Sequence, residues 1–158
     1  MAQFSITIAG DSAINLVFGD TISPETNGVI RSAAQTLEAD PIAGVRELVP
    51  TFCSLMVIYD PLIIGIDELC ERVRGKLRNL TTTEQSVKRI VKIPVCYDEE
   101  FALDMDTVAA HAHLTPEEVI ALHTGHDYLI DMLGFLPGFA YLGGLDERLH
   151  TPRLATPR

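Results

Sequence analysis

The stretch "LGFLPGFAYLGGL", residues 133–145, has a composition that could build a ligand-binding loop. Its glycines would let the backbone adopt positive φ and approach a neighbour closely, and its proline would stiffen the turn. Such a loop can present backbone N–H groups and a phenol hydroxyl to a small polar ligand. The residues concerned are Gly134, Gly138, Gly143, Gly144, Pro137, Phe135, Phe139 and Tyr141. A tight packing corner would use the same glycines, and residue types alone favour that simpler interpretation.

Two arginines follow this loop, in two "TPR" units that end at Arg153 and Arg158. A guanidinium group suits bidentate contact with a carboxylate or a phosphate. Both residues can equally be solvated surface cations, and the sequence leaves these two interpretations open.

The histidines do not form the pattern of a metal site. His111 and His113 are two residues apart on a predicted helix, so they face different directions. A zinc ion needs three or four convergent ligands, and no such spacing is present. His123 ends a predicted helix, where the helix dipole favours a protonated imidazole, so its type and place favour a capping role.

The remaining polar motifs give little chemistry. "YDEEF" holds three adjacent carboxylates, which can raise one pKa, but an exposed acidic turn is the favoured interpretation. The sequence has no GxxxxGK[ST] or GxGxxG phosphate loop and no GxSxG nucleophile motif. If the protein uses ATP, the nucleotide site is therefore non-standard or belongs to a partner.

The elements that must position these residues begin with a small α+β domain. Alternating apolar residues predict a strand over 3–9, and segments bounded by turn residues predict further strands near 13–18, 45–52 and 54–60. Ser23 as N-cap, Pro24 at the first position and Glu25 in the first turn predict a helix from 24. A second amphipathic helix is predicted over 65–80. The order β-β-α-β-β-α indicates two helices on one face of a mainly antiparallel sheet.

A second domain is predicted after a polar linker. We expect the domain boundaries at 1–80, 81–88 (linker) and 89–158. Residues 90–97 and "DYLIDMLGF" read as strands, and Thr115 with Glu118 predicts a capping box for a short helix. Two strands rarely make a stable sheet, so we expect this second domain to be incomplete in the chain.

Composition excludes several classes of function. The chain has 158 residues, a formal net charge of −10 and no basic cluster, which argues against a nucleic-acid partner. No apolar run approaches the roughly 20 residues of a membrane span, and no signal peptide is evident. The 3 scattered cysteines indicate a reducing, cytoplasmic environment.

The motifs together resemble a known family. "GDSAINLVFG", "IPVCYDEEFALDMDTVA", "LGFLPGFAYLGGL" and "TPRLATPR" are similar to the family that includes the B-type subunit of 5-oxoprolinase, the kinase inhibitor KipI and allophanate hydrolase subunit 1. The resemblance implies a small N-terminal α+β domain and a C-terminal cyclophilin-like β-barrel. Family members continue with a Pro-Gly-Gly-Trp loop, and this sequence contains no Trp.

The resemblance also implies a function. It implies a component of an ATP-dependent 5-oxoprolinase, inactive alone, which opens 5-oxo-L-proline to L-glutamate. ATP with Mg would be a co-substrate at a partner or shared site. The implied partners are a C-type subunit (allophanate hydrolase subunit 2) and an A-type subunit (LamB/YcsF). The implied substrate-binding residues are His123, Gly138, Phe139, Tyr141, Gly143, Gly144, Arg153 and Arg158. The alternatives are a KipI-like inhibitor of a sensor histidine kinase and a carboxyltransferase subunit of the allophanate hydrolase or urea carboxylase type.

Overall fold

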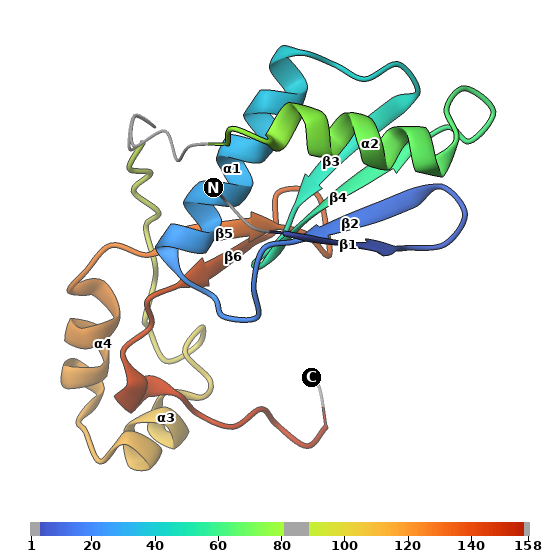
Figure 1. Ribbon diagram of the computed structural model, residues 1–158. Coiled ribbons are helices and arrows are strands. Elements are labelled where there is room, and N and C mark those ends of the chain that lie inside the picture. Colours follow the sequence, from blue (N-terminus) through green and yellow to red (C-terminus); the bar gives the residue numbers. More distant parts are fainter. Residues whose placement is uncertain (1–3, 81–88, 157–158) are drawn as a thin grey trace. The chain divides into compact units, whose positions relative to one another are not determined.

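The computed structural model describes residues 4–80 and 89–156 (Figure 1). The chain divides into two compact units. Unit 1 comprises Met1–Val87 and Asp131–Tyr141, and unit 2 comprises Lys88–Ile130 and Leu142–Arg158. The predicted linker at 81–88 lies outside the described residues, so the domain boundaries stay a prediction.

Unit 1 contains a four-stranded antiparallel sheet in the order β1-β2-β4-β3. The strands are β1 (Ser5–Ile8), β2 (Ala13–Val17), β3 (Val45–Pro50) and β4 (Ser54–Tyr59). The register places Leu16 opposite Leu55, so the apolar residues of β2 and β4 lie on one face. A bulge interrupts the pairing of β3 with β4 between Val45 and Glu47.

Two helices cover that apolar face, α1 (Pro24–Ala39) and α2 (Ile66–Leu77) (Figure 1). The Ser23 hydroxyl accepts a hydrogen bond from the Thr26 amide, and Pro24 occupies the first turn, so the expected cap is present. The predicted order β-β-α-β-β-α is confirmed. The shared core of helices and sheet consists of Ile14, Leu16, Ile30, Ala33, Ala34, Leu37, Ile42, Leu55, Val57, Tyr59, Ile64, Leu69, Val73, Leu77 and Leu80.

A β-hairpin is formed by β5 (Leu129–Leu133) and β6 (Ala140–Gly143). Its distal part, Asp131–Tyr141, belongs to unit 1. There the buried side-chain amide of Asn27 on α1 donates a hydrogen bond to the backbone oxygen of Asp131 over 2.8 Å. This bond fixes the hairpin against the first turns of α1, although the two residues are far apart in sequence.

Unit 2 is built on two short helices, α3 (Met105–Ala112) and α4 (Pro116–Thr124), and a 3-10 turn, η1 (Glu147–Leu149). Its buried core is small: Ala109, Val119 and Leu149 are surrounded by partly buried apolar residues. No helix within the described part of the chain has the length and apolarity that crossing a membrane requires.

The structure corrects two sequence-based expectations. Residues 89–98 have no regular secondary structure, whereas the sequence predicts a strand over 90–97. Pro94 cannot donate to a strand ladder, and apolar character without a pairing partner does not make a strand. Residues 140–143, predicted to be loop, form β6 instead.

The α+β class with antiparallel sheets is confirmed. The described strands outside the four-stranded sheet form one two-stranded sheet, and the described residues contain no closed barrel.

Candidate functional site

Unit 2 brings together four aromatic side chains with titratable or polar groups, which we call the His–Tyr cluster: Tyr97, His123, His126 and Tyr128. His123 lies in the last turn of α4, whose start is fixed by the predicted capping box. The Thr115 amide donates to the Glu118 carboxylate over 2.8 Å, and the Glu118 amide donates to the Thr115 hydroxyl over 3.3 Å. The helix ends at Gly125, and the short segment before β5 carries His126 and Tyr128.

Two tyrosines hold His123 through hydrogen bonds. The Tyr97 hydroxyl lies 2.5 Å from His123 Nδ1. The Tyr128 hydroxyl donates to the backbone oxygen of His123 over 2.9 Å. Their rings also pack against the imidazole, with centroid distances of 6.0 Å for Tyr97 and 5.6 Å for Tyr128. The imidazole is thus fixed both at its backbone and at one ring nitrogen.

His126 is fixed in a different way. Its Nε2 lies 2.6 Å from the backbone oxygen of Gly144, and its ring packs against that of Tyr128 with the centroids 4.6 Å apart and the planes tilted by 38°. A carbonyl oxygen can only accept a hydrogen bond, so Nε2 of His126 carries a proton. Gly144 has a φ of +99°, a conformation that favours glycine.

The surroundings of Tyr128 keep its hydroxyl protonated, so that it can donate a hydrogen bond. Burial raises the pKa of Tyr128, and the nearby Tyr97 and Asp146 raise it further. Asp146 itself is held ionised, because hydrogen bonds from the side chain and the amide of Arg148 lower its pKa to about 2. The cluster therefore has a fixed negative charge near its edge and a phenol that does not ionise at neutral pH.

The hairpin loop in unit 1 forms a separate chain of aromatic contacts. Four rings meet edge to face, one after another. The ring centroids are 5.8 Å apart for Phe135 and Phe139, 5.2 Å for Phe139 and Tyr141, and 5.6 Å for Tyr141 and Phe52. The Tyr141 hydroxyl has no hydrogen-bond partner among the described residues. Phe135 is 83% exposed, so the loop displays apolar surface rather than burying it.

Backbone geometry in this loop differs in part from expectation. Gly138 and Gly144 have positive φ as predicted, at +79° and +99°, but Gly134 and Gly143 do not. Phe135 takes a φ of +62°, which is costly for an aromatic residue and which residue types do not indicate. The turn is closed by hydrogen bonds from the Gly134 amide to the Phe139 oxygen and from the Phe139 amide to the Leu136 oxygen.

The predicted site residues fall into two groups. Gly138, Phe139 and Tyr141 belong to unit 1, whereas His123, Gly143, Gly144 and Arg153 belong to unit 2. Within unit 2 the structure links Gly144 to the His–Tyr cluster through His126. Arg153 is exposed and has no ion-pair partner among the described residues. Arg158 lies outside the described residues.

Sequence reasoning missed Tyr97, His126 and Tyr128 as members of this cluster. Tyr97 is 26 positions from His123, and no spacing rule joins a residue without regular structure to the end of a helix. The alternation of His126 and Tyr128 just before β5 was the available signal, because alternate residues of an extended segment share a face. The carboxylates of "YDEEF" are exposed, as an acidic turn would have them.

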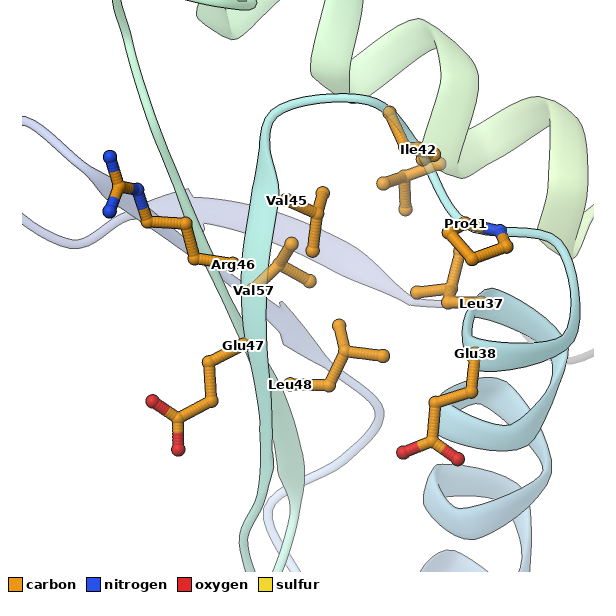
Figure 2. Close-up of a pocket in the computed structure, with 10 residues that line it drawn as sticks. Leu37, Glu38, Pro41, Ile42, Val45, Arg46, Glu47, Leu48 and Val57 are labelled. Carbon is orange, nitrogen blue, oxygen red and sulfur yellow. The ribbon is translucent and has the colours of Figure 1, made fainter.

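Two cavities of ligand size lie among the described residues, and each is lined by residues of a single unit. In unit 1 a cavity of about 310 Å³ lies between the end of α1 and the sheet. Leu37, Pro41 and Ile42 face Val45, Leu48 and Val57 across it (Figure 2). In unit 2 a cavity of about 340 Å³ is lined mainly by apolar residues, together with Tyr97, Cys96 and Asp104. Tyr97 therefore belongs both to a cavity and to the His–Tyr cluster.

The described residues contain no group of three or more His, Cys, Asp or Glu side chains arranged to hold a metal ion. The His–Tyr cluster is instead suited to hydrogen bonding and proton exchange, because it combines two imidazoles with two phenols.

Comparison with known proteins gives the family. Residues 4–158 match the family described as carboxyltransferase domain, subdomain C and D. The chain belongs to this family. The B subunit of 5-oxoprolinase from Bacillus subtilis (strain 168) is 39% identical over 166 residues, which cover 99% of this chain and 69% of the relative. The protein of the same name from Escherichia coli O157:H7 is 34% identical, over 96% of this chain and 68% of the relative.

A solved structure is also similar to this chain. The crystal structure of TTHA0988 matches with a TM-score of 0.77 and 33% identity, over 92% of this chain and 28% of that chain. The fold described above is thus part of a longer polypeptide in this relative.

Proposed function

We propose that the protein is a component of an ATP-dependent 5-oxoprolinase, which opens 5-oxo-L-proline to L-glutamate. The observation that carries the proposal is the 39% identity to the 5-oxoprolinase B subunit of B. subtilis over nearly the whole chain. The E. coli relative of the same name supports it independently. The proposed setting is the cytoplasm.

The proposed chemistry uses ATP to activate a stable amide. The γ-phosphoryl group passes to the lactam oxygen and ADP leaves. Water then adds to the activated carbon, the ring C–N bond breaks and the nitrogen takes up protons, which leaves an acyl phosphate. A second water hydrolyses the acyl phosphate to the carboxylate and free phosphate. ATP with Mg binds at a partner or shared site, because the chain has no phosphate loop. The proposed partners are a C-type subunit (allophanate hydrolase subunit 2) and an A-type subunit (LamB/YcsF), and the chain alone is inactive.

Two structural expectations belong to the same proposal. The chain is divided at 81–88 into an N-terminal domain over 1–80 and a second domain over 89–158. The second domain is part of a cyclophilin-like β-barrel. The polar composition of residues 81–88 supports the first statement, and the sequence resemblance described above supports the second.

Substrate contacts are proposed for the residues that the resemblance indicated. In unit 2, His123 provides an imidazole held by two tyrosines. Arg153 provides an exposed guanidinium that could bind the substrate carboxylate, and it has no ion-pair partner among the described residues. Gly143, Gly144 and Arg158 complete the proposed set in this part of the chain. In unit 1, Gly138, Phe139 and Tyr141 offer aromatic surface and a phenol hydroxyl that no described residue contacts by a hydrogen bond.

The test is reconstitution with the presumed partners. The three proteins are co-expressed and purified as a complex, and ATP hydrolysis is measured with 5-oxoproline and with proline. Proline keeps the ring and the carboxylate but lacks the lactam carbonyl, so we expect hydrolysis with 5-oxoproline only. Omission of this chain should abolish the activity. A complete complex that hydrolyses no ATP in response to 5-oxoproline contradicts the proposal.

A further inference from the structure

We propose that Tyr97 is a positioning residue that fixes the neutral His123 side chain in the Nε2–H tautomer. His123 then presents a neutral N–H donor to an oxygen atom of a bound ligand. The inference rests on the 2.5 Å hydrogen bond between the Tyr97 hydroxyl and His123 Nδ1.

The direction of this hydrogen bond follows from the two groups. A phenol O–H is a stronger donor than a neutral imidazole N–H, and an imidazole nitrogen is a stronger acceptor than a phenol oxygen. The proton therefore lies on Tyr97, and Nδ1 accepts it. In neutral imidazole one nitrogen accepts and the other carries the proton, so the bond at Nδ1 places the proton on Nε2.

Tyr128 prevents the imidazole from moving away from this partner. Its hydroxyl holds the His123 backbone oxygen at 2.9 Å, and its ring packs on the imidazole. The Tyr97 ring meets the same imidazole nearly edge on, at 84° between planes. With the backbone and Nδ1 both fixed, the place of Nε2 is fixed as well.

Two other histidines of unit 2, His111 and His126, use the opposite ring nitrogen. The Nε2 atoms of His126 and His111 donate to the backbone oxygens of Gly144 and His150, over 2.6 and 3.1 Å. Those donors are already used within the fold. In His123 it is Nδ1 that is used, and Nε2 has no hydrogen-bond partner among the described residues.

The ligand that fits a neutral N–H donor is one with a carbonyl or carboxylate oxygen. This step rests on the proposed function, where the oxygen is that of the lactam or the carboxylate of 5-oxoproline. A neutral N–H can donate a hydrogen bond to either kind of oxygen.

The first test reads the tautomer directly in the intact chain. Long-range ¹H–¹⁵N NMR at neutral pH distinguishes a protonated from an unprotonated ring nitrogen for each histidine. We expect His123 to show protonated Nε2 and unprotonated Nδ1. In Tyr97→Phe the ¹⁵N chemical shifts of the two His123 ring nitrogens should lie closer together, because the variant loses the hydroxyl that selects one tautomer. A protonated Nδ1 in the neutral wild-type His123 overturns the proposal, whether or not any variant folds.

The matched control is Tyr128→Phe, which removes a hydroxyl from the same cluster but one that contacts the backbone of His123. It should leave the His123 nitrogen pattern unchanged. His126 is an internal reference with protonated Nε2 in every sample. If Tyr97→Phe and Tyr128→Phe alter His123 equally, or neither alters it, Tyr97 has no special positioning role.

A second test uses the reconstituted complex. A Gln side chain can place its amide N–H near the position of Nε2, whereas an Asn amide reaches only to the position of Nδ1. His123→Gln should therefore retain at least on the order of tenfold more kcat/KM for 5-oxoproline than His123→Asn. Equal loss in both variants refutes the donor role. A wild-type complex without activity contradicts the proposed function instead, and the NMR result then still decides the tautomer.

Discussion

Asp131 is a carboxylate in a buried position, with 7% of its surface exposed. Burial raises its pKa above the ordinary value of 3.8. Because its pKa is raised in the folded state, the contribution of Asp131 to the free energy of unfolding is fully present below pH 3.8. It is lost as the pH rises through the folded pKa, because a charge must then be buried.

Asp131→Asn should therefore reduce the loss of stability that wild type shows as the pH rises above 3.8. We expect the free energy of unfolding of the variant, relative to wild type, to increase as the pH rises above 3.8. Urea unfolding followed by circular dichroism between pH 3 and pH 7 measures it. Asp146→Asn is the control with the opposite sign, because the pKa of Asp146 is lowered to about 2 and its contribution is lost as the pH falls from 3.8. Parallel profiles for wild type and Asp131→Asn contradict the prediction.

Gly138 offers a second test on a single residue. A Cβ atom added there would meet nothing within 4 Å, but the residue has a φ of +79°. Gly138→Ala should therefore lower the free energy of unfolding by about 1 kcal/mol through backbone strain alone. Gly19→Ala is the matched control, since Gly19 also has open space but no positive φ, and it should cost far less. Equal effects in thermal or urea unfolding would show that the loop relaxes.

Among the elements, α4 carries the most direct consequence for the site, because its last turn holds His123. Thr115→Ala removes the hydroxyl that accepts the Glu118 amide and should cost about 1 kcal/mol of stability. Thr124→Ala in the same helix is the control. The Thr124 hydroxyl only donates back to the Ile120 oxygen, so its loss should be nearly neutral. Urea unfolding of both variants measures the difference, and equal costs would mean that the cap contributes nothing particular.

The sequence predicted those elements whose signals are local. The caps at Ser23 and Thr115 and the apolar strand segments that became β2 and β4 each depend on a few neighbouring residues, and all are confirmed. The strand expected at 90–97 is wrong, because strand formation depends on a partner that the apolar pattern does not reveal. β6 was not predicted, because the glycine-rich composition around it indicates a loop and does not reveal its pairing with β5.

The candidate site was predictable only in part for the same reason. His123 was named through a resemblance, and its place in the last turn of α4 followed from the capping box. Its contact with Tyr97 depends on a segment without regular structure folding back to the helix, and no periodicity encodes that. The hydrogen bond between Asn27 and Asp131 was equally hidden, since a polar residue in the first turn of a helix usually faces solvent.

At the scale of the whole molecule, that last bond joins parts of unit 1 that are distant in sequence. Asn27→Ala would leave the buried Asp131 oxygen without its donor, so we expect a loss of about 1–3 kcal/mol in the free energy of unfolding. Gln35→Ala on the exposed side of the same helix is the control and should change stability little. Amide hydrogen exchange in β5 should rise in the first variant only. Unchanged exchange there would show that the hairpin is held by other contacts.

The discontinuity of unit 1 has a consequence for how the protein is made. The ribosome delivers residues 1–87 first, but the hairpin segment that completes this unit follows only after residues 88–130. At roughly 5–20 residues per second, the nascent chain waits for several seconds before Asn27 and Phe52 can meet their partners. During that interval an unpaired amide and an aromatic ring stay open to other proteins. Translation speed through residues 88–130 is therefore expected to affect the yield of folded protein.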